Sequence, residues 1–280
     1  MGRARAFRQV DVFTAVPLRG NPVAVVLDAD DLGAEEMAAT ARWTNLSETT
    51  FVLTPTEPGA DYCVRIFTPG GELPFAGHPT LGTAHAWLET GGVPATEGTV
   101  VQECGVGLVT LRHDGGRLAF AAPPVQRSAL DPATRERIVA ALGLSGDTVV
   151  DAQVLENGPR WHVLRLDAAA TVLAVAPDLA ALAAARLDVG LVGPHPAGAP
   201  AQVEVRAFAP ALGIPEDAVT GSLNAAVAQW LQGAGVLPEA YVAAQGTALG
   251  RAGRVHLTRE GATTWVGGDT VSVVRGTVVL

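Results

Sequence analysis

Two stretches of the chain decide its fold. Residues 65–80 read RIFTPGGELPFAGHPT, and residues 206–222 read RAFAPALGIPEDAVTGS. Each begins with Arg-x-Phe-x-Pro in a strand-like pattern, crosses a polar loop to a glycine and a polar residue, and enters an apolar helix that carries Trp-Leu. The glycine-to-tryptophan spacing is 10 residues in the first stretch and 9 in the second. We interpret this correspondence as an internal repeat, which predicts two similar domains.

The repeat has a consequence for ligand binding. If the two domains face each other, each presents a helix N-terminus to the space between them. Backbone N–H groups and partial positive charge at such helix ends suit a carboxylate. The alternative is that two ordinary strand–loop–helix units resemble each other by coincidence.

The rest of the chain supplies many short strands and few helices. A linker is expected at residues 122–124, where Ala-Pro-Pro breaks the pattern. This composition of elements predicts an α+β fold with two domains. Alternation predicts strands at 7–14, 22–27, 50–53, 62–68, 99–102, 106–112, 117–121, 149–155, 160–166, 202–208, 240–244, 253–258 and 264–267, with a hairpin pair at 270–280; helical periodicity appears at 34–43, 80–89, 132–142, 178–185 and 222–232.

Composition excludes several classes of function. The 280 residues carry a formal net charge of −9, which makes nucleic acid and anionic membranes poor partners. All 19 basic residues are arginine, so no lysine can form a Schiff base with pyridoxal phosphate or serve a phosphate-binding loop. Hydrophobic residues make up 48% of the chain, enough for a large core.

Cysteine content and hydropathy predict a soluble cytoplasmic protein. Two cysteines, Cys63 and Cys104, make neither a disulfide framework nor a zinc site. The first ten residues lack the apolar run of a signal peptide. The Ala-rich stretch 168–185 is broken by Pro177 and Asp178, so it cannot span a bilayer.

Glu48 is the first candidate for acid–base chemistry. It is the only ionisable group in the segment 45–50, and apolar residues 51–53 follow it. Desolvation at the rim of a core raises the pKa of a carboxyl group toward the range that a general base needs. The alternative is a solvated loop acid.

His78 is the second candidate. Pro79 favours the first position of a helix, which places His78 at the cap. Histidine carries protons near neutral pH, although a purely structural capping role is the alternative. His85 lies two helical turns further on, but no third ligand completes a metal site, so we reject a metal.

Asp217 is the acidic candidate in the second stretch, with Glu216 as its rival, and both could be solvated loop acids. The chain has no dinucleotide-binding glycine loop and no Gly-x-Ser-x-Gly element. Acid–base groups without a cofactor, metal or thiol pair point to proton abstraction and redelivery on a small carboxylate.

These motifs resemble those of the PhzF family of phenazine-biosynthesis isomerase-like proteins, over nearly the whole chain. The resemblance rests on Gly20-Asn21-Pro22, Asn45-Leu46-Ser47-Glu48-Thr49, residues 65–82, Phe208-Ala209-Pro210 with Glu216-Asp217 and Thr220-Gly221-Ser222, Gln245-Gly246 with Gly250-Arg251 and Gly253, and Val266-Gly267-Gly268.

The resemblance implies the diaminopimelate-epimerase-like fold, in which two similar domains each wrap a curved, mostly antiparallel, barrel-like sheet around a central helix. The N-terminal domain would span 1–122, completed by a C-terminal strand at about 271–280, and the C-terminal domain would span 123–270. The family also implies a homodimer, and the absence of a lysine, a metal ligand set and a dinucleotide-binding loop predicts that no cofactor is used. Ala218 replaces a proline common after the Glu-Asp pair, which puts the placement of that loop in doubt.

By resemblance, Glu48 moves a proton between carbons, with help from His78 and Asp217. Substrate binding falls to residues that flank these groups, namely Ser47, Gly77, Gly221 and Ser222. The best-known activity of the family is isomerisation of a dihydro-hydroxyanthranilate.

Three interpretations follow from the resemblance: a cofactor-independent isomerase, an epimerase that uses Glu48 and Asp217, and a non-catalytic small-molecule binder. Racemases of the same fold carry a cysteine before each helix glycine, where this chain has Ala76 and Thr220. A two-thiol mechanism is therefore not expected, and Cys63 is expected to be a small core residue.

Overall fold

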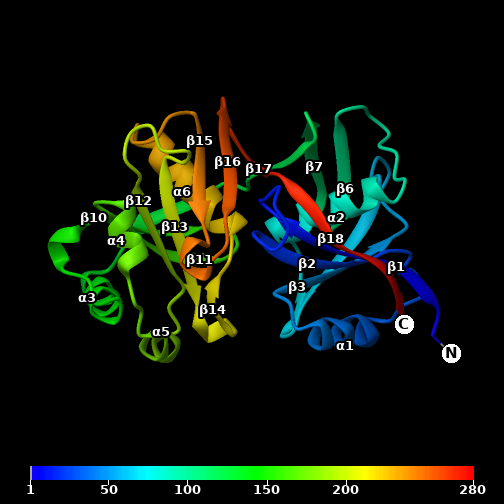
Figure 1. Ribbon diagram of the computed structural model, residues 1–280, viewed down its shortest axis with the longest axis horizontal. Helices are drawn as coiled ribbons and strands as arrows, with labels where there is room; N and C mark the ends of the chain where they lie inside the picture. Colours follow the sequence, from blue (N-terminus) through cyan, green and yellow to red (C-terminus); the bar gives the residue numbers. More distant parts are fainter. Residues whose placement is uncertain (1) are drawn as a thin grey trace. The chain divides into compact units, whose positions relative to one another are not determined.

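The computed structural model describes residues 2–280, and the chain divides into two compact units. Unit 1 is the chain up to Ala121 together with Gly267–Leu280, and unit 2 is Ala122–Val266. In Figure 1 unit 1 carries the elements from blue to blue-green, the green strand labelled β7 and the red strand labelled β18, and unit 2 carries the remaining green, yellow and orange elements.

Unit 1 is one curved sheet with a helix at its centre. Its strands are β1 (Ala4–Val12), β2 (Asn21–Val26), β3 (Glu48–Leu53), β4 (Tyr62–Thr68), β5 (Gly71–Leu73), β6 (Thr99–Cys104), β7 (Gly107–Asp114), β8 (Arg117–Ala121) and β18 (Thr270–Val279). Neighbouring strands are antiparallel, except that β2 with β3 and β4 with β6 are parallel.

Helix α2 (Gly77–Glu89) is the central helix of unit 1. It packs against β1, β2, β3, β6, β8 and β18, and most of its residues are buried. Gly82 permits this packing, because a Cβ at that position would lie only 2.4 Å from a methyl group of Val23. Helix α1 (Ala34–Thr44) covers the other side of the sheet, where Met37 packs with Phe51 and Phe67.

Unit 2 repeats the same order of elements. Its strands are β9 (Gln126–Ala129), β10 (Val149–Glu156), β11 (Arg160–Leu166), β12 (Val189–Pro194), β13 (Val203–Ala209), β14 (Ile214–Asp217), β15 (Ala240–Gln245), β16 (Gly253–Glu260) and β17 (Thr263–Gly268), whose last two residues belong to unit 1. Again all pairs between β9 and β16 are antiparallel, except that β11 with β12 and β13 with β15 are parallel.

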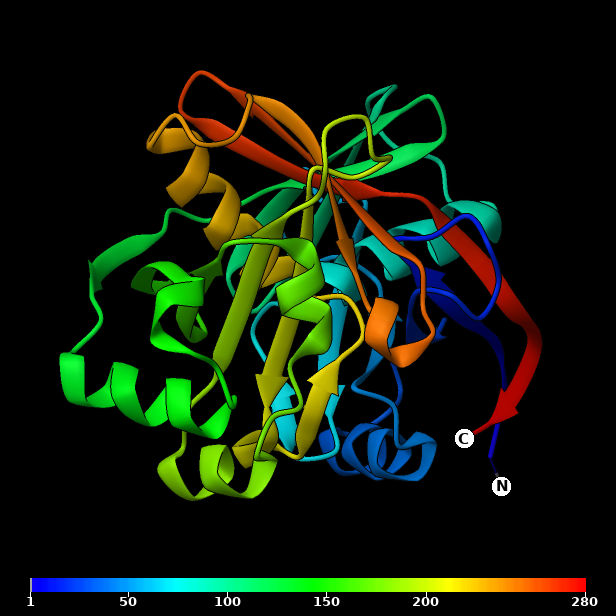
Figure 2. The same cartoon turned by 60° about the vertical axis from the view of Figure 1, so that its left-hand side comes forward.

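The central helix of unit 2 is α6 (Gly221–Gly233), which is buried over most of its length. Helices α3 (Pro132–Ala141), α4 (Ala169–Ala174) and α5 (Leu179–Ala185) form the outer layer, visible as the green group beside the strands in Figure 2. A cluster that includes Ile138, Val172, Leu182, Val189 and Leu191 joins this layer to the sheet. Short 3-10 turns lie at Gly146–Thr148, Pro210–Leu212 and Thr247–Leu249.

The two units repeat the same side-chain contacts of the Arg-x-Phe arginine. Arg65 forms two hydrogen bonds of 2.7 Å to Glu72, and its guanidinium lies 5.1 Å from the Phe67 ring centre. Arg206 forms the same pair with Glu216 at 2.9 and 2.8 Å, and lies 4.9 Å from the ring centre of the phenylalanine two residues on. Together with the strand order, this confirms the expected α+β fold of two similar halves.

Three sequence expectations are wrong in detail. Helix α2 begins at Gly77 after the N-cap residue Ala76, so His78 and Pro79 are its second and third residues rather than its cap and first residue. The first turn tolerates proline because its N–H groups have no partner within the helix. Residues 270–279 form one strand that pairs with β1 instead of a hairpin, and strands β5, β9, β12 and β14 and helix α4 were not expected.

No helix among residues 2–280 is both long enough and apolar enough to cross a membrane.

Candidate active site

Unit 1 brings Glu48 and His78 together. Glu48 is the first residue of β3, and His78 lies in the first turn of α2. Glu48 Oε2 lies 3.3 Å from His78 Nε2, and the two side chains are 12% and 6% exposed. The structure therefore places a carboxylate and an imidazole side by side in a largely dry environment, where a proton can be held or passed.

Asn21 sets the orientation of the imidazole. It begins β2, the parallel neighbour of β3, and its Nδ2 lies 3.4 Å from His78 Nδ1. An amide nitrogen only donates, so Nδ1 accepts and the proton of a neutral imidazole is on Nε2, which faces Glu48. The first residues of parallel neighbours lie at the same edge of a sheet, which explains how residues far apart in sequence meet here.

Neighbouring hydroxyl groups hold the strand that carries Glu48. Thr83 of α2 donates to Thr50 at 2.8 Å, and Thr44 and Thr49 are bonded at 2.7 Å. Asn45 ends α1 in the left-handed conformation with φ 53°, so only a short turn separates that helix from Glu48. Ser47 is half-buried within this turn.

Unit 2 holds Asp217 in a network of buried amides. Thr220 Oγ1 donates to Asp217 Oδ2 at 2.7 Å. Gln245 donates to the Asp217 carbonyl at 3.2 Å and to Thr220 Oγ1 at 2.9 Å, while its Oε1 accepts from Thr220 N and from Asn224 at 2.9 and 2.7 Å. These bonds tie the loop that carries Asp217 to α6 and β15.

Gly221 and Ser222 form the first turn of α6. Trp161 Nε1 donates to Ser222 Oγ at 3.2 Å, and Asn157 donates to the Ser222 carbonyl at 2.9 Å. Because the Ser222 oxygen accepts from the indole, its own hydrogen remains available to donate to a ligand. Gly77 has the same place at the start of α2.

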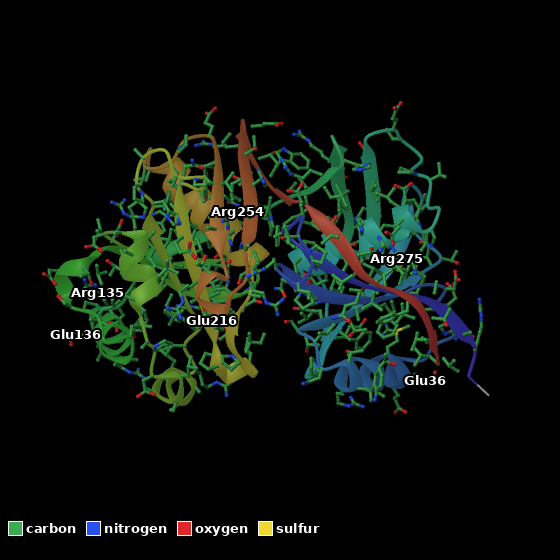
Figure 3. The ribbon with its side chains drawn as sticks, in the orientation of Figure 1. Glu36, Arg135, Glu136, Glu216, Arg254 and Arg275 are labelled. Carbon is green, nitrogen blue, oxygen red and sulfur yellow. The ribbon has the colours of Figure 1, made fainter. Side chains whose placement is uncertain are left out.

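The structure thus arranges the expected residues in two groups. Glu48, Ser47, Gly77 and His78 lie in unit 1, and Asp217, Gly221 and Ser222 lie in unit 2. Glu216, the rival of Asp217, lies within β14 and is instead paired with Arg206; Figure 3 labels it. Sequence reasoning assigned no role to Asn21, Asn157, Trp161, Asn224 and Gln245, because uncharged buried side chains give no spacing signal.

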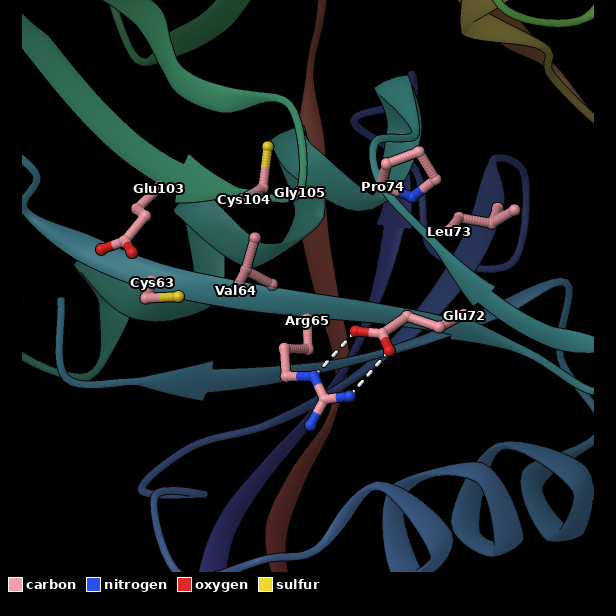
Figure 4. Close-up of a pocket in the computed structure, with 9 residues that line it drawn as sticks. All are labelled: Cys63, Val64, Arg65, Glu72, Leu73, Pro74, Glu103, Cys104 and Gly105. Atoms are coloured by element: carbon pink, nitrogen blue, oxygen red, sulfur yellow. Dashed lines mark hydrogen bonds and ion pairs between the residues drawn. The ribbon is translucent and has the colours of Figure 1, made fainter. Parts of the chain in front are cut away.

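The two cysteines lie elsewhere in unit 1. Both line a pocket of about 440 Å³ with Arg65, Glu72 and Pro74 (Figure 4). Burial raises the pKa of Cys63 to about 11 and also raises that of Cys104, so both remain poorly nucleophilic thiols at neutral pH. The expectation that Cys63 is a core residue is wrong, since it is half-buried at the pocket wall.

Among the side chains that the structure describes, which leave out those of Met1 and Asp114, no group of three or more His, Cys, Asp or Glu is arranged to hold a metal ion.

Comparison with known proteins identifies the family. The model of the PhzC-PhzF family, phenazine biosynthesis-like protein, matches residues 10–277. This chain belongs to the PhzC-PhzF family. It is 39% identical to trans-2,3-dihydro-3-hydroxyanthranilate isomerase of Pseudomonas aeruginosa over 275 residues, which covers 95% of this chain and 92% of the relative. It is 33% identical to the uncharacterized isomerase YddE of Escherichia coli O157:H7 over 263 residues, 89% of this chain and 88% of the relative.

Solved structures agree with this assignment. A predicted epimerase from Pseudomonas aeruginosa superposes with a TM-score of 0.80 at 29% identity, covering 98% of this chain and 99% of the other. A hydroxyproline epimerase from Agrobacterium vitis shares the fold, with a TM-score of 0.60 at 15% identity over 100% of this chain and 94% of the other. The PhzC-PhzF assignment makes the chain an enzyme of the isomerase class.

Proposed function

We propose that this PhzC-PhzF protein moves a proton within a small cyclic carboxylate and uses Glu48 as general acid and base, without a cofactor. The observation that carries the proposal is the buried pair of Glu48 and His78, 3.3 Å apart, at the N-terminus of α2. The relative named for trans-2,3-dihydro-3-hydroxyanthranilate supports a substrate of this kind.

In the proposed reaction, the Glu48 carboxylate removes a proton from one carbon of the substrate and returns it to another. The proton is conserved, so neither an oxidant nor a reductant is needed. Nε2 of His78 steadies Glu48 while it is charged and donates to the substrate when Glu48 holds the proton. The sequence has no lysine to bind pyridoxal phosphate and no glycine loop to bind a nicotinamide dinucleotide, which supports a reaction without either cofactor.

Substrate binding is assigned to the first turns of α2 and α6. The N–H groups at Gly77 and Gly221 have no partner within their helices, and a helix N-terminus favours an anion. Ser222 would donate its hydroxyl hydrogen, Ser47 would contact the substrate beside Glu48, and Asp217 would accept from it. We propose that the protein acts in the cytoplasm and that its active form is a homodimer. Light scattering after gel filtration tests the oligomeric state directly.

Two other readings share these residues. An epimerase would use Glu48 and Asp217 on opposite faces of one carbon, and the solved structure described as a predicted epimerase makes this the second candidate. A non-catalytic binder would keep the pocket, although it would have no need of a base beside an oriented histidine.

The test is the Glu48→Gln variant with trans-2,3-dihydro-3-hydroxyanthranilate in deuterated water. Glutamine has nearly the same shape but cannot accept the proton, so turnover should fall by about 10²–10⁴-fold while binding changes little. Transfer of deuterium to a new carbon supports isomerisation, and exchange at one carbon with inversion supports epimerisation. Turnover of the variant within a few-fold of the wild type would contradict the assignment of Glu48, whereas wild-type turnover without deuterium uptake would mean that the same proton is returned before it exchanges with water.

A further inference from the structure

The repeat gives Glu48 a counterpart in unit 2. In unit 1, Thr49 lies opposite Phe67 in the pairing of β3 with β4. In unit 2, Val189 lies opposite Phe208 in the pairing of β12 with β13. Both phenylalanines belong to the repeated Arg-x-Phe, so the residue before Val189, which is Asp188, has the place of Glu48.

The parallel partner strand gives the same correspondence. Glu48 lies opposite Val23 of β2. His162 of β11 lies opposite Val189, and its N–H donates to the Asp188 carbonyl at 2.9 Å, which extends the parallel ladder by one position. Asp188 therefore sits beside Trp161, the residue that precedes His162.

Alternation along β12 places Asp188 on the side of the central helix. Val189 and Leu191 belong to the outer cluster with α3, α4 and α5. Gly190 faces the other way, since a Cβ there would lie 2.5 Å from Leu223 of α6. Side chains two residues apart share a face of a strand, so Asp188 lies on the α6 side, as Glu48 lies on the α2 side.

The surroundings of Asp188 belong to the candidate site. Its neighbour Trp161 donates an indole hydrogen to Ser222 in the first turn of α6. Asp188 is half-buried, and this burial raises the pKa of its carboxyl, against the opposing charges of His162 and Arg186. A carboxyl desolvated at this place costs stability unless a ligand compensates it.

We propose that Asp188 is a substrate-binding residue of unit 2 that determines specificity, by accepting a hydrogen bond from an amino or hydroxyl group of the substrate. The inference rests on the proposed function and adds a second group of the substrate that the protein recognises, beside the carboxylate. The N-terminus of α6 attracts the carboxylate of the substrate. Asp188 beside it disfavours a second anionic group and favours a neighbouring N–H or O–H donor.

The experiment compares two ligands with three proteins by calorimetry. The ligands are 3-hydroxyanthranilate, an aromatic acid with amino and hydroxyl donors, and benzoate, which has the carboxylate alone. The proteins are the wild type, Asp188→Asn and the control Asp147→Asn, which removes an exposed carboxylate of the same unit. Circular dichroism and the Tm verify that each variant is folded.

Asp188→Asn should raise the Kd for 3-hydroxyanthranilate by about 10- to 100-fold, because hydrogen bonds to charged groups are stronger than hydrogen bonds between neutral groups. The same substitution should change the Kd for benzoate by less than about two-fold. Asp147→Asn should leave the Kd for both ligands unchanged. In turnover, Asp188→Asn should raise KM more than it lowers kcat.

Equal losses for both acids would mean that Asp188 acts only through the fold, and unchanged binding of both would mean that it does not face the ligand; either result overturns the inference. If Glu48→Gln abolishes turnover while Asp188→Asn behaves as the wild type, this inference alone fails. If wild-type protein binds neither acid, the inference fails together with the proposed substrate class.

Discussion

The two copies of the Arg–Glu pair allow one substitution to be compared at two levels of burial in one molecule. In unit 2 the side chains of Arg206 and Glu216 are 6% and 11% exposed, and Arg206 also donates to the carbonyls of Val172 and Val175 at 3.1 and 2.6 Å. In unit 1 the corresponding side chains of Arg65 and Glu72 are 31% and 42% exposed.

Substitution by methionine keeps much of the apolar stem and removes the charge. Arg206→Met leaves Glu216 and two carbonyls without their donor in a buried place, and breaking such a pair costs about 3–5 kcal/mol. Arg65→Met leaves a carboxylate that water can reach, so the expected loss is about 0–1 kcal/mol. The same chemical change should therefore differ by about 2–5 kcal/mol between the two units.

Urea denaturation followed by circular dichroism measures the difference. Where the denaturation curve shows two transitions, one for each unit, each transition is fitted on its own. A double variant, Arg206→Met with Glu216→Leu, should recover much of the loss, because a buried ion pair can be replaced by apolar side chains at little cost. Equal losses for Arg206→Met and Arg65→Met would refute the argument from burial.

Other expectations concern the thiols, the buried amides and pH. Cys63→Ser combined with Cys104→Ser should leave kcat/KM within a few-fold of the wild type, and iodoacetamide should inactivate only slowly because burial raises the pKa of Cys63 to about 11; rapid inactivation that substrate prevents would disprove this. Gln245→Leu removes four hydrogen bonds and should cost about 2–5 kcal/mol in denaturation, whereas the exposed Gln202→Leu removes one and should cost about 1 kcal/mol or less; similar losses would count against the network. Burial lowers the pKa of His85, so the unfolded chain takes up its proton more readily and stability should fall as pH drops below about 6.5; His85→Asn should flatten this dependence in denaturation measured from pH 7.5 to 5, and an unchanged slope would contradict it.

The repeat could be predicted from sequence because its marks are local. Arg65 and Arg206 each precede a phenylalanine and a proline at fixed spacing, and a glycine then begins an apolar helix. Short strands such as β5 and β14 have too few residues to show alternation. The start of α2 was misplaced because proline fits several positions of a first turn, and only the backbone shows which one is used.

For the candidate site, too, the sequence indicates the charged residues but not the uncharged residues that position them. Glu48, His78 and Asp217 could be proposed from the sequence because each is an ionisable group close to apolar residues. Asn21 and Gln245, which position two of them, are uncharged, and their partners are distant in sequence. The role that we propose for Asp188 has no local sequence motif, because it depends on the register of β12 with its neighbouring strands.

The pairing of β18 with β1 also bears on how the protein is made. β1 lies between β2 and β18, and β18 is far from both in sequence, so one edge of β1 stays open until β18 has been synthesised. Unit 2 is a continuous insertion, and all of its residues emerge earlier than β18. Unit 1 therefore cannot complete its sheet before unit 2 has been synthesised, and a variant truncated after residue 269 should expose β1 to proteases while unit 2 stays protected.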